Sequence, residues 1–351
     1  MDECIKIAQC FLRDVTKENT EISVVESGLI NNTFKLKILN QTYIMQRINR
    51  NVFKNPKIIH VNYSKVYKHL VESKYPRNKL EFIKSINGDE LVIFENEPWR
   101  ISRCIEGETS HVCNSLEMAF NAAEALAEFH FHLQDLDMNT IITPIPGFCD
   151  FKFRLEEFKK ATIFGNQSRR LIGDKLIQEL KANLHLIQSY IELVKHIPKR
   201  VIHGDPKLSN FLFDKTNENV ISLIDIDTIM PGTILYDFGD MVRSFTNTLK
   251  EDDSMGIECF NKDIYEALFN GYNKIAKEFV TDQESKNMPL AAMCLALIQS
   301  IRFLTDYLND DAYYQVSYEI QNFDRASNQF SFFKEIKDYL SLQKSIYDGN
   351  K

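Results

Sequence analysis

Residues 201–213 read VIHGDPKLSNFLF, and residues 221–227 read ISLIDID. Together they place three carboxylates and an amide beside short apolar segments, a pattern typical of strands that end in turns. Transfer of a phosphoryl group needs one carboxylate to orient the attacking hydroxyl and accept its proton, and oxygen ligands to hold Mg²⁺ against the β- and γ-phosphates. The two segments contain both kinds of group, so they predict a site for phosphoryl transfer.

The first segment reproduces the spacing of the protein-kinase catalytic loop, in which a lysine and an asparagine follow His-x-Asp at two and five residues past the aspartate. Here these residues are His203, Asp205, Lys207 and Asn210. We expect Asp205 to act as the catalytic base, Lys207 to reach the γ-phosphoryl group and Asn210 to bind the metal. His203 should brace the loop through hydrogen bonds, because kinase catalysis depends mainly on positioning and charge neutralisation.

The second segment supplies the remaining candidate metal ligands. Asp225 ends an apolar strand predicted over residues 220–224, where a kinase carries the aspartate of its Asp-Phe-Gly motif. Asp227 should lie on the same face of that strand and act as a further ligand. Each piece alone is common, since an aspartate before proline usually forms a turn. Their order and spacing make the combination specific.

At these residues the chain resembles the aminoglycoside phosphotransferase and choline kinase superfamily, which is marked by a His-Gly-Asp loop ending in asparagine. More narrowly, it is similar to the N-acetylhexosamine 1-kinases along most of its length. The supporting segments are GLINNTF (28–34), YIMQRIN (43–49), KLSNFLFD (207–214), DIDTIMPG (225–232), YDFGD (236–240) and RFLTDYL (302–308). The resemblance implies a kinase that uses ATP and Mg²⁺ to phosphorylate a small molecule, first of all an N-acetylhexosamine at its anomeric hydroxyl.

The resemblance also implies how the nucleotide is held. A glycine-containing turn would cover the triphosphate with backbone N–H groups, and a hinge over residues 100–105 would offer backbone groups to adenine. The residues implied in nucleotide binding are Gly28, Asn31, Asn32, Thr33, Arg103 and Ile105.

Further residues are implied in anchoring and in acceptor binding. Asp237 would tie down the catalytic loop, or cap the next helix, and both roles are compatible. Arg302, Asp306 and Tyr313 would form the acceptor-binding face. The alternative is that charges on the predicted helix 291–308 simply form a solvated face.

The chain departs from protein kinases where the lysine that pairs with the phosphates should stand. Either Gln46 or Arg47 must replace it, and strand alternation lets only one of them point inward. Gln46 shares the face of Ile44, which we expect to be buried, whereas Arg47 has the required charge. The predicted helix 56–73 has no central glutamate, only Glu72 near its end, so the usual lysine–glutamate ion pair is also missing.

The order of elements predicts an α+β, protein-kinase-like bilobal fold. An amphipathic helix, a small antiparallel sheet and one helix packed against that sheet should form the first lobe. The predicted strands are 22–26, 33–38, 41–48, 81–86, 90–94 and 99–105, with 81–86 and 90–94 forming a hairpin around Asn87-Gly88. Because 351 residues exceed the ~250–300 that one core supports, we expect a nucleotide-binding N-terminal lobe, 1–103, and a mainly helical C-terminal lobe, 104–351, with the catalytic loop and acceptor site.

The composition and the net charge indicate the class of protein, its compartment and its partners. A hydrophobic content of 44% and a charged content of 26% are ordinary for a soluble globular protein. The net charge of -7 argues against nucleic acid as a partner. Seven cysteines without a C-x-x-C pair suit a reducing cytoplasm. The longest nearly uncharged apolar run, 290–298, is shorter than the ~18–20 residues of a membrane span. We expect a cytoplasmic monomer or homodimer.

Other patterns are weaker or leave alternatives open. Glu128, His130 and His132 lack the spacing of H-E-x-x-H and should serve packing or surface roles. The acidic residues 251–253 are most simply a solvated loop, but they would also attract a cationic acceptor, so an aminoglycoside, choline or amino-alcohol kinase remains an alternative. A nucleotide-binding pseudokinase is a second alternative, prompted by the missing lysine.

Overall fold

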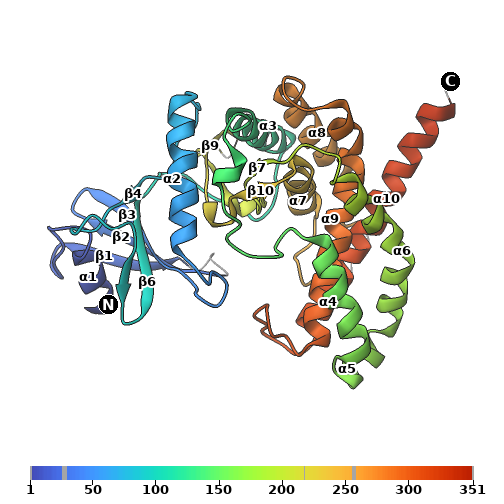
Figure 1. The fold of residues 1–351 in the computed structure, drawn as a ribbon, viewed down its shortest axis with the longest axis horizontal. Helices are drawn as coiled ribbons and strands as arrows, with labels where there is room; N and C mark the ends of the chain where they lie inside the picture. The colour runs from blue at the N-terminus through green and yellow to red at the C-terminus, as the bar shows by residue number, and fades with distance from the viewer. Residues whose placement is uncertain (1, 26–29, 217, 255–257, 350–351) are drawn as a thin grey trace.

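The computed structural model describes residues 2–25, 30–216, 218–254 and 258–349. Gly28 of the expected phosphate-covering turn lies outside these residues. The chain forms a small sheet lobe and a larger helical lobe, with one long helix, α2 (Lys57–Glu72), standing between them in Figure 1. The expected bilobal α+β fold, with an antiparallel sheet followed by a mainly helical part, is confirmed.

The sheet lobe is a single antiparallel sheet of six strands in the order β1-β2-β3-β6-β4, with β5 paired to the other end of β6. Its strands are β1 (Thr20–Val25), β2 (Asn32–Ile38), β3 (Gln41–Arg47), β4 (Phe82–Ile83), β5 (Val92–Phe94) and β6 (Glu97–Arg103). Side chains alternate between its two faces. One face buries Leu36, Met45 and Ile101 in a core shared with helix α1 (Asp2–Gln9). The opposite face is therefore the one available for a ligand.

The hairpin expected between 81–86 and 90–94 is wrong. β4 and β5 each pair with β6 and not with each other, and the tight hairpin joins β5 to β6 through Glu95 and Asn96. Both of these residues have positive φ, 48° and 69°, as a two-residue hairpin turn of type I′ requires. Gly88 does form a turn, at φ 90°, but the segment before it is bonded to the residue that follows α1, since the N–H of Ile86 donates to the carbonyl of Cys10.

Helix α2 contacts the sheet, as expected, where Tyr63 packs on Phe82 of β4, and it also packs on the helical lobe. Its buried side chains, including Ile59, Val66 and Leu70, belong to the large core that runs through the helical lobe. The helix on the apolar face of the sheet is α1. Asn62 of α2 fastens it to the helical lobe, because its amide donates to the carbonyl of Ile229 at 3.0 Å. Helix α2 thus links the two lobes.

The helical lobe is built around α9, which packs against α4, α6, α7 and α10, while α3 packs against α8. Its helices are α3 (Leu116–His132), α4 (Phe151–Phe164), α5 (Gln167–Ile172), α6 (Asp174–Leu193), α7 (Ile234–Thr246), α8 (Lys262–Ala276), α9 (Asp282–Leu308) and α10 (Gln321–Gly349). By length and composition α9 alone among the described helices passes as a membrane span, but 72% of its apolar window is buried. It has the character of a core helix.

Two short pairs of antiparallel strands support the predicted catalytic segments. β7 (Arg200–Ile202) pairs with β10 (Met230–Gly232), and β8 (Phe211–Phe213) pairs with β9 (Val220–Leu223). The turns between them carry the polar residues, in short 3-10 helices at Leu208–Asn210 and Ile226–Thr228. This arrangement brings the ends of β7 and β9 together.

Candidate active site

The loop after β7 is fixed by its backbone. Gly204 has φ 85°, and a Cβ atom on it would lie 2.6 Å from the carbonyl oxygen of Thr228, so only glycine fits. The carboxylate of Asp237 accepts the N–H of His203 at 2.7 Å and that of Gly204 at 2.9 Å. The Thr228 hydroxyl donates to the carbonyl of His203 at 2.9 Å. These contacts fix the backbone immediately before Asp205.

Asp237 is fully buried in the first turn of α7, and its anchoring extends further into the helical lobe. His130 Nε2 lies 2.9 Å from the same carboxylate, and His130 Nδ1 lies 2.8 Å from the hydroxyl of Tyr272. The residue that caps α7 is Thr233, so Asp237 does not have the alternative role of helix cap. Glu128 pairs with Arg77 at 2.7 Å.

His203 is buried and braces the loop from the other side. Its Nε2 lies 3.0 Å from the carbonyl oxygen of Ile224, so it donates there, and the neutral ring is favoured because burial lowers its pKa. The contact ties the loop after β7 to the end of β9. With no exposed surface, His203 positions the loop rather than touching an acceptor.

Asp205 lies within a compact set of donors. Lys207 Nζ is 2.7 Å and Asn210 Nδ2 is 3.1 Å from its Oδ2, and Asn210 Nδ2 also donates to its carbonyl at 2.8 Å. Burial alone would raise the pKa of Asp205, but the ammonium group of Lys207 lowers it below its ordinary value. The carboxylate is ionised, and in the described part of the chain its Oδ1 has no hydrogen bond. That oxygen can accept a proton from an incoming hydroxyl.

Asp225 follows β9 in the left-handed conformation, with φ 59° and ψ 54°, which is uncommon for a residue other than glycine. Burial, and next the neighbouring Asp227 and Asp205 carboxylates, raise its pKa to about 6. Such a buried accumulation of acids suits a divalent cation, which would neutralise it. Asn210 is adjacent, since its carbonyl accepts the N–H of Ile224 at 2.9 Å.

The donor set fits Mg²⁺ better than a softer metal. No cluster of three or more His, Cys, Asp or Glu side chains with metal-site geometry occurs within residues 2–25, 30–216, 218–254 and 258–349. The protein would therefore supply few ligands to the metal, namely the carboxylate of Asp225 and the amide oxygen of Asn210. Mg²⁺ is commonly held in this way, with waters and nucleotide phosphates completing its octahedron.

The expected position of Asp227 is wrong. It lies in the 3-10 helix after Asp225 and not on a strand, because the left-handed turn at Asp225 ends the strand geometry. Its Oδ1 is 2.7 Å from Nη1 of Arg100, and its Oδ2 accepts the amide N–H of Asn31 at 2.8 Å. The carboxylate is buried and already committed to these two partners. Asp227 therefore joins the turn that carries the candidate metal ligand Asp225, here called the metal-site turn, to the sheet.

Gln46 and Arg100 are cross-strand partners on β3 and β6, on the sheet face opposite α1. Arg100 donates from Nε and Nη2 to Gln46 Oε1, at 3.0 and 2.7 Å. Arg47 points to the other face, where it is half-buried and its guanidinium donates to the side-chain oxygen of Asn32. Of the two candidates, Gln46 is therefore the residue on the face opposite α1. The fully buried strand face, however, is that of Tyr43 and Met45 and not that of Ile44.

The sequence did not identify the side chain of Arg100 as part of this cluster. We expected only its backbone to take part, as one end of the hinge that binds adenine. The signal was present: alternation along 97–103 places Arg100 on one face. Which face, and beside which residue, depends on the register between β3 and β6. A sequence does not state that register.

The segment before β2 joins this cluster. The side-chain oxygen of Asn31 accepts the N–H of Asn49 at 3.0 Å while its amide donates to Asp227. Thr33 Oγ1 lies 3.2 Å from Gln46 Nε2. The structure thus brings Asn31 and Thr33 together with Gln46, whereas Asn32 faces outward to Arg47.

The expected hinge follows β6 at the border of the two lobes. The backbone N–H of Arg103 donates to the carbonyl of Glu81 at 2.9 Å, and its side chain pairs with the Glu81 carboxylate at 3.0 Å. A cavity of about 500 Å³ lies against this segment. It is lined by Tyr67, Asn78, Lys79, Glu81, Arg103, Cys104, Ile105 and Glu106.

The expected acceptor residues differ in their surroundings and in what their side chains offer. Asp306 is buried and accepts the N–H groups of Tyr313 and Tyr314 at 2.8 and 2.9 Å, so it shapes the loop after α9 and is not part of a solvated face. Tyr313 is 48% exposed. Arg302 lies 5.8 Å from the ring of Tyr314 and 5.4 Å from that of Phe148. Tyr314, rather than Tyr313, is the aromatic neighbour of Arg302.

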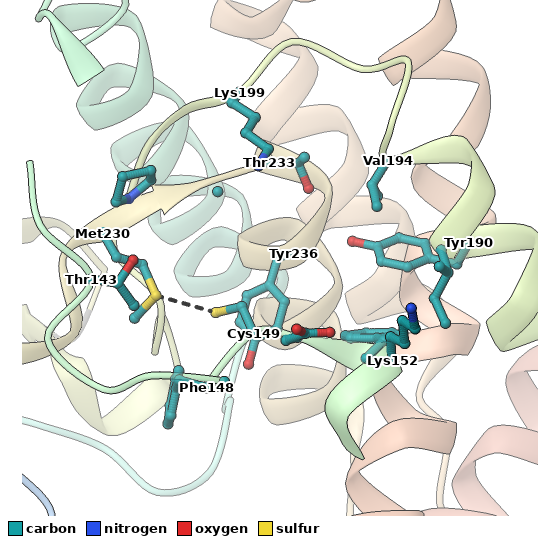
Figure 2. Close-up of a pocket in the computed structure, with 16 residues that line it drawn as sticks. Thr143, Phe148, Cys149, Lys152, Tyr190, Val194, Lys199, Met230, Thr233 and Tyr236 are labelled. Carbon is teal, nitrogen blue, oxygen red and sulfur yellow. Dashed lines mark hydrogen bonds between the residues drawn. The ribbon is translucent and has the colours of Figure 1, made fainter. Parts of the chain in front are cut away.

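A cavity of about 400 Å³ adjoins this aromatic pair (Figure 2). It lies between the segment 143–152, α6 and the start of α7, with Thr143 and Met230 on one side and Tyr190 on the other. Phe148 lines the cavity and also stacks beside Arg302. The cavity and the Arg302 cluster are therefore neighbours.

A sheet lobe, a helical lobe and an aspartate loop anchored between them define a kinase-like enzyme that transfers phosphoryl groups. Residues 21–260 match the model of the phosphotransferase enzyme family, and the chain belongs to that family. The superfamily expected from the sequence is thereby confirmed.

Solved structures with the same fold include an aminoglycoside phosphotransferase from Alicyclobacillus acidocaldarius, with a TM-score of 0.61, 12% identity and 95% of both chains covered. A choline kinase from Cryptosporidium parvum has a TM-score of 0.60 and 14% identity, over 98% of this chain and 97% of that one. A spectinomycin phosphotransferase in complex with ADP and spectinomycin has a TM-score of 0.59 and 12% identity, over 95% and 93%. At these identities the likeness establishes the fold.

Proposed function

We propose that this phosphotransferase moves the γ-phosphoryl group of ATP to the anomeric hydroxyl of an N-acetylhexosamine, giving the sugar 1-phosphate. Asp205 is the base, and the nucleotide lies between the lobes 1–103 and 104–351. Its setting supports this role: the anchored backbone at Gly204 holds the carboxylate in place, and Lys207 keeps it ionised. A solved relative in complex with ADP is consistent with nucleotide use.

Each residue of the loop has a defined task in this proposal. Asp205 Oδ1 accepts the proton of the attacking hydroxyl, while Lys207, on Oδ2, lies close enough to offset charge on the transferred group. Asn210 and Asp225 would hold Mg²⁺, which supplies charge neutralisation at the β- and γ-phosphates. His203 and Asp237 keep the loop in register.

The nucleotide would lie along the sheet face that carries Gln46. The turn from Gly28 to Thr33 would cover its phosphates, and backbone groups of Arg103 to Ile105 would meet adenine. The cavity beside this hinge and the half-buried Gln46 side chain support such a path. This placement assigns the phosphates to the end of the sheet nearest Asp225.

The observation that carries the choice of acceptor is the charge around Arg302. Near the base, Asp205 is paired with Lys207 at 2.7 Å and Asp240 with Arg243 at 2.8 Å. Arg302 has no carboxylate within 4 Å among the described residues, and aromatic rings flank it. A cation in this position disfavours a cationic acceptor and suits a neutral sugar with hydroxyl and acetamido acceptors, while the rings suit the apolar face of a sugar.

Two of the acidic residues 251–253 already have a polar partner in the protein. Glu251 pairs with Arg325 at 3.4 Å, and Asp252 accepts the amide of Gln321 at 2.8 Å. Each of these two carboxylates thus has a partner from α10. This weakens the argument for an aminoglycoside, choline or amino-alcohol kinase.

A panel assay tests the proposal. The purified protein with Mg-ATP should phosphorylate N-acetylglucosamine or N-acetylgalactosamine with a higher kcat/KM than glucosamine, choline, ethanolamine or an aminoglycoside. Faster turnover of a cationic acceptor would reverse the choice. Binding of Mg-ATP without turnover of any acceptor would instead favour a pseudokinase.

A further inference from the structure

The Arg100 guanidinium is buried and faces two side chains of the protein. Its Nε and Nη2 both donate to Gln46 Oε1, and its Nη1 faces the Asp227 carboxylate. Only 2% of the residue is exposed, and its Cζ atom lies 4.9 Å from the centroid of the Phe82 ring. A ligand in the cleft therefore has little access to the N–H groups of Arg100. Any effect of its charge on a nucleotide must pass through a neighbouring group.

Gln46 is the neighbour that transmits this charge. Arginine nitrogens only donate, so the amide atom that faces Arg100 must be the oxygen, and the NH₂ group must point away. That NH₂ group lies 3.2 Å from Thr33 Oγ1, toward the turn between β1 and β2. An amide whose oxygen accepts two bonds from a cation is polarised, and its N–H groups become stronger donors.

The same geometry accounts for the absent lysine. A lysine at position 46 would place an ammonium group against the buried guanidinium of Arg100, where repulsion between like charges is strong. A neutral residue with both an acceptor and donors satisfies Arg100 and still offers N–H groups to the cleft. Glutamine has that combination.

We propose that Gln46 replaces the phosphate-pairing lysine as a neutral donor to the nucleotide's phosphates, with Arg100 as the residue that orients and polarises it. The inference rests on the proposed use of a nucleotide. Asp227 balances the charge of Arg100 and accepts a hydrogen bond from the amide of Asn31. These two contacts hold together the sheet, the metal-site turn and the segment before β2 that we place over the phosphates.

Two substitutions at position 46 separate donation from packing. Gln46→Glu keeps an oxygen for Arg100, so its melting temperature should equal or exceed that of the wild type, but the N–H donors are lost. Gln46→Met removes the donors without adding charge. Gln41→Glu is the matched control, because it makes the same chemical change at the exposed start of β3.

Affinities for Mg-ADP and for adenosine are measured by isothermal titration calorimetry. Both Gln46 variants should bind Mg-ADP at least about tenfold more weakly than the wild type, while adenosine, which has no phosphates, binds unchanged. Gln41→Glu should match the wild type with both ligands.

The possible results distinguish the inference from the proposal beneath it. Wild-type affinity of either Gln46 variant for Mg-ADP would overturn the donor role, and an effect of Gln46→Glu alone would reduce it to charge repulsion. An equal loss of adenosine and Mg-ADP affinity would show a packing effect and overturn it as well. If the wild type bound no Mg-ADP, the proposed function would fail together with the inference.

Discussion

Arg100 of β6 and Asp227 beside the candidate metal ligand Asp225 form a buried ion pair, with 2.7 Å between Nη1 and Oδ1. The side chains are 3% and 1% exposed. The two atoms are within ion-pair distance without the angle of a hydrogen bond, so their attraction is mainly Coulombic. Because Arg100 belongs to the sheet and Asp227 to the helical lobe, the pair fastens one lobe to the other.

Asp227→Asn should destabilise the protein, because it leaves the guanidinium of Arg100 buried without a counter-charge. Breaking one partner of a buried pair costs about 3–5 kcal/mol, and urea unfolding measures this loss. Glu21→Gln is the control, since Glu21 and Lys37 form an exposed pair at 3.7 Å whose loss should leave the unfolding free energy unchanged. Equal stability of Asp227→Asn and the wild type would show that the pair contributes nothing.

Asp205→Asn should remove the proposed base while the loop stays folded. Asparagine still accepts hydrogen bonds from Lys207 and Asn210, but it takes no proton from a hydroxyl, so kcat should fall about 10²- to 10⁴-fold. Calorimetry with Mg-ADP checks that nucleotide binding persists. Glu218→Gln, at an exposed position in the turn before β9, serves as the control for expression and assay. Retained turnover in Asp205→Asn would assign the base to another residue.

The catalytic loop could be predicted from the sequence because its geometry is local. His203, Asp205, Lys207 and Asn210 lie within one loop, so their spacing alone determines which side chains meet. Most helices and strands also followed their apolar period. The spacing of apolar residues does not indicate which strands pair with each other. The prediction of a hairpin around Gly88 was wrong for that reason.

The contacts between the lobes lay beyond prediction for the same physical reason. The role of Arg100 depends on the register of β6 against β3, and that of Asp227 on the left-handed turn at Asp225. Asp306 shows a third case: its helical spacing fits a solvated face, yet the loop after α9 returns and buries it. Each outcome depends on segments distant in sequence.

Binding of Mg²⁺ should weaken in acid through Asp225. Burial raises its pKa to about 6, above the ordinary 3.8, so the folded metal-free protein keeps a proton that the unfolded chain has already lost. The group favours folding below pH 4, and this contribution disappears as pH rises through 6. A metal needs the carboxylate ionised, so apparent Mg²⁺ affinity should fall about tenfold between pH 7 and pH 5.

Titration of Mg²⁺ in the presence of ADP at pH 5, 6 and 7 measures this dependence. Asp225→Asn is the control, since it retains the titration of the nucleotide itself but lacks the carboxylate. The difference between the two pH profiles isolates Asp225. Parallel profiles would mean that this carboxylate does not take up the proton that opposes the metal.

Arg302 should decide which acceptors bind. Arg302→Met keeps a long apolar side chain between Phe148 and Tyr314 but removes the guanidinium, so a neutral N-acetylhexosamine loses hydrogen-bond donors. In this variant the KM for the N-acetylhexosamine should rise at least about tenfold, while the KM for ATP is unchanged. Removing the same charge should improve any weak turnover of choline, because a like-charge repulsion disappears. Arg13→Met, at an exposed position after α1, is the matched control. If kcat/KM for sugar and choline fell together, Arg302 would be supporting the helical lobe and not selecting the acceptor.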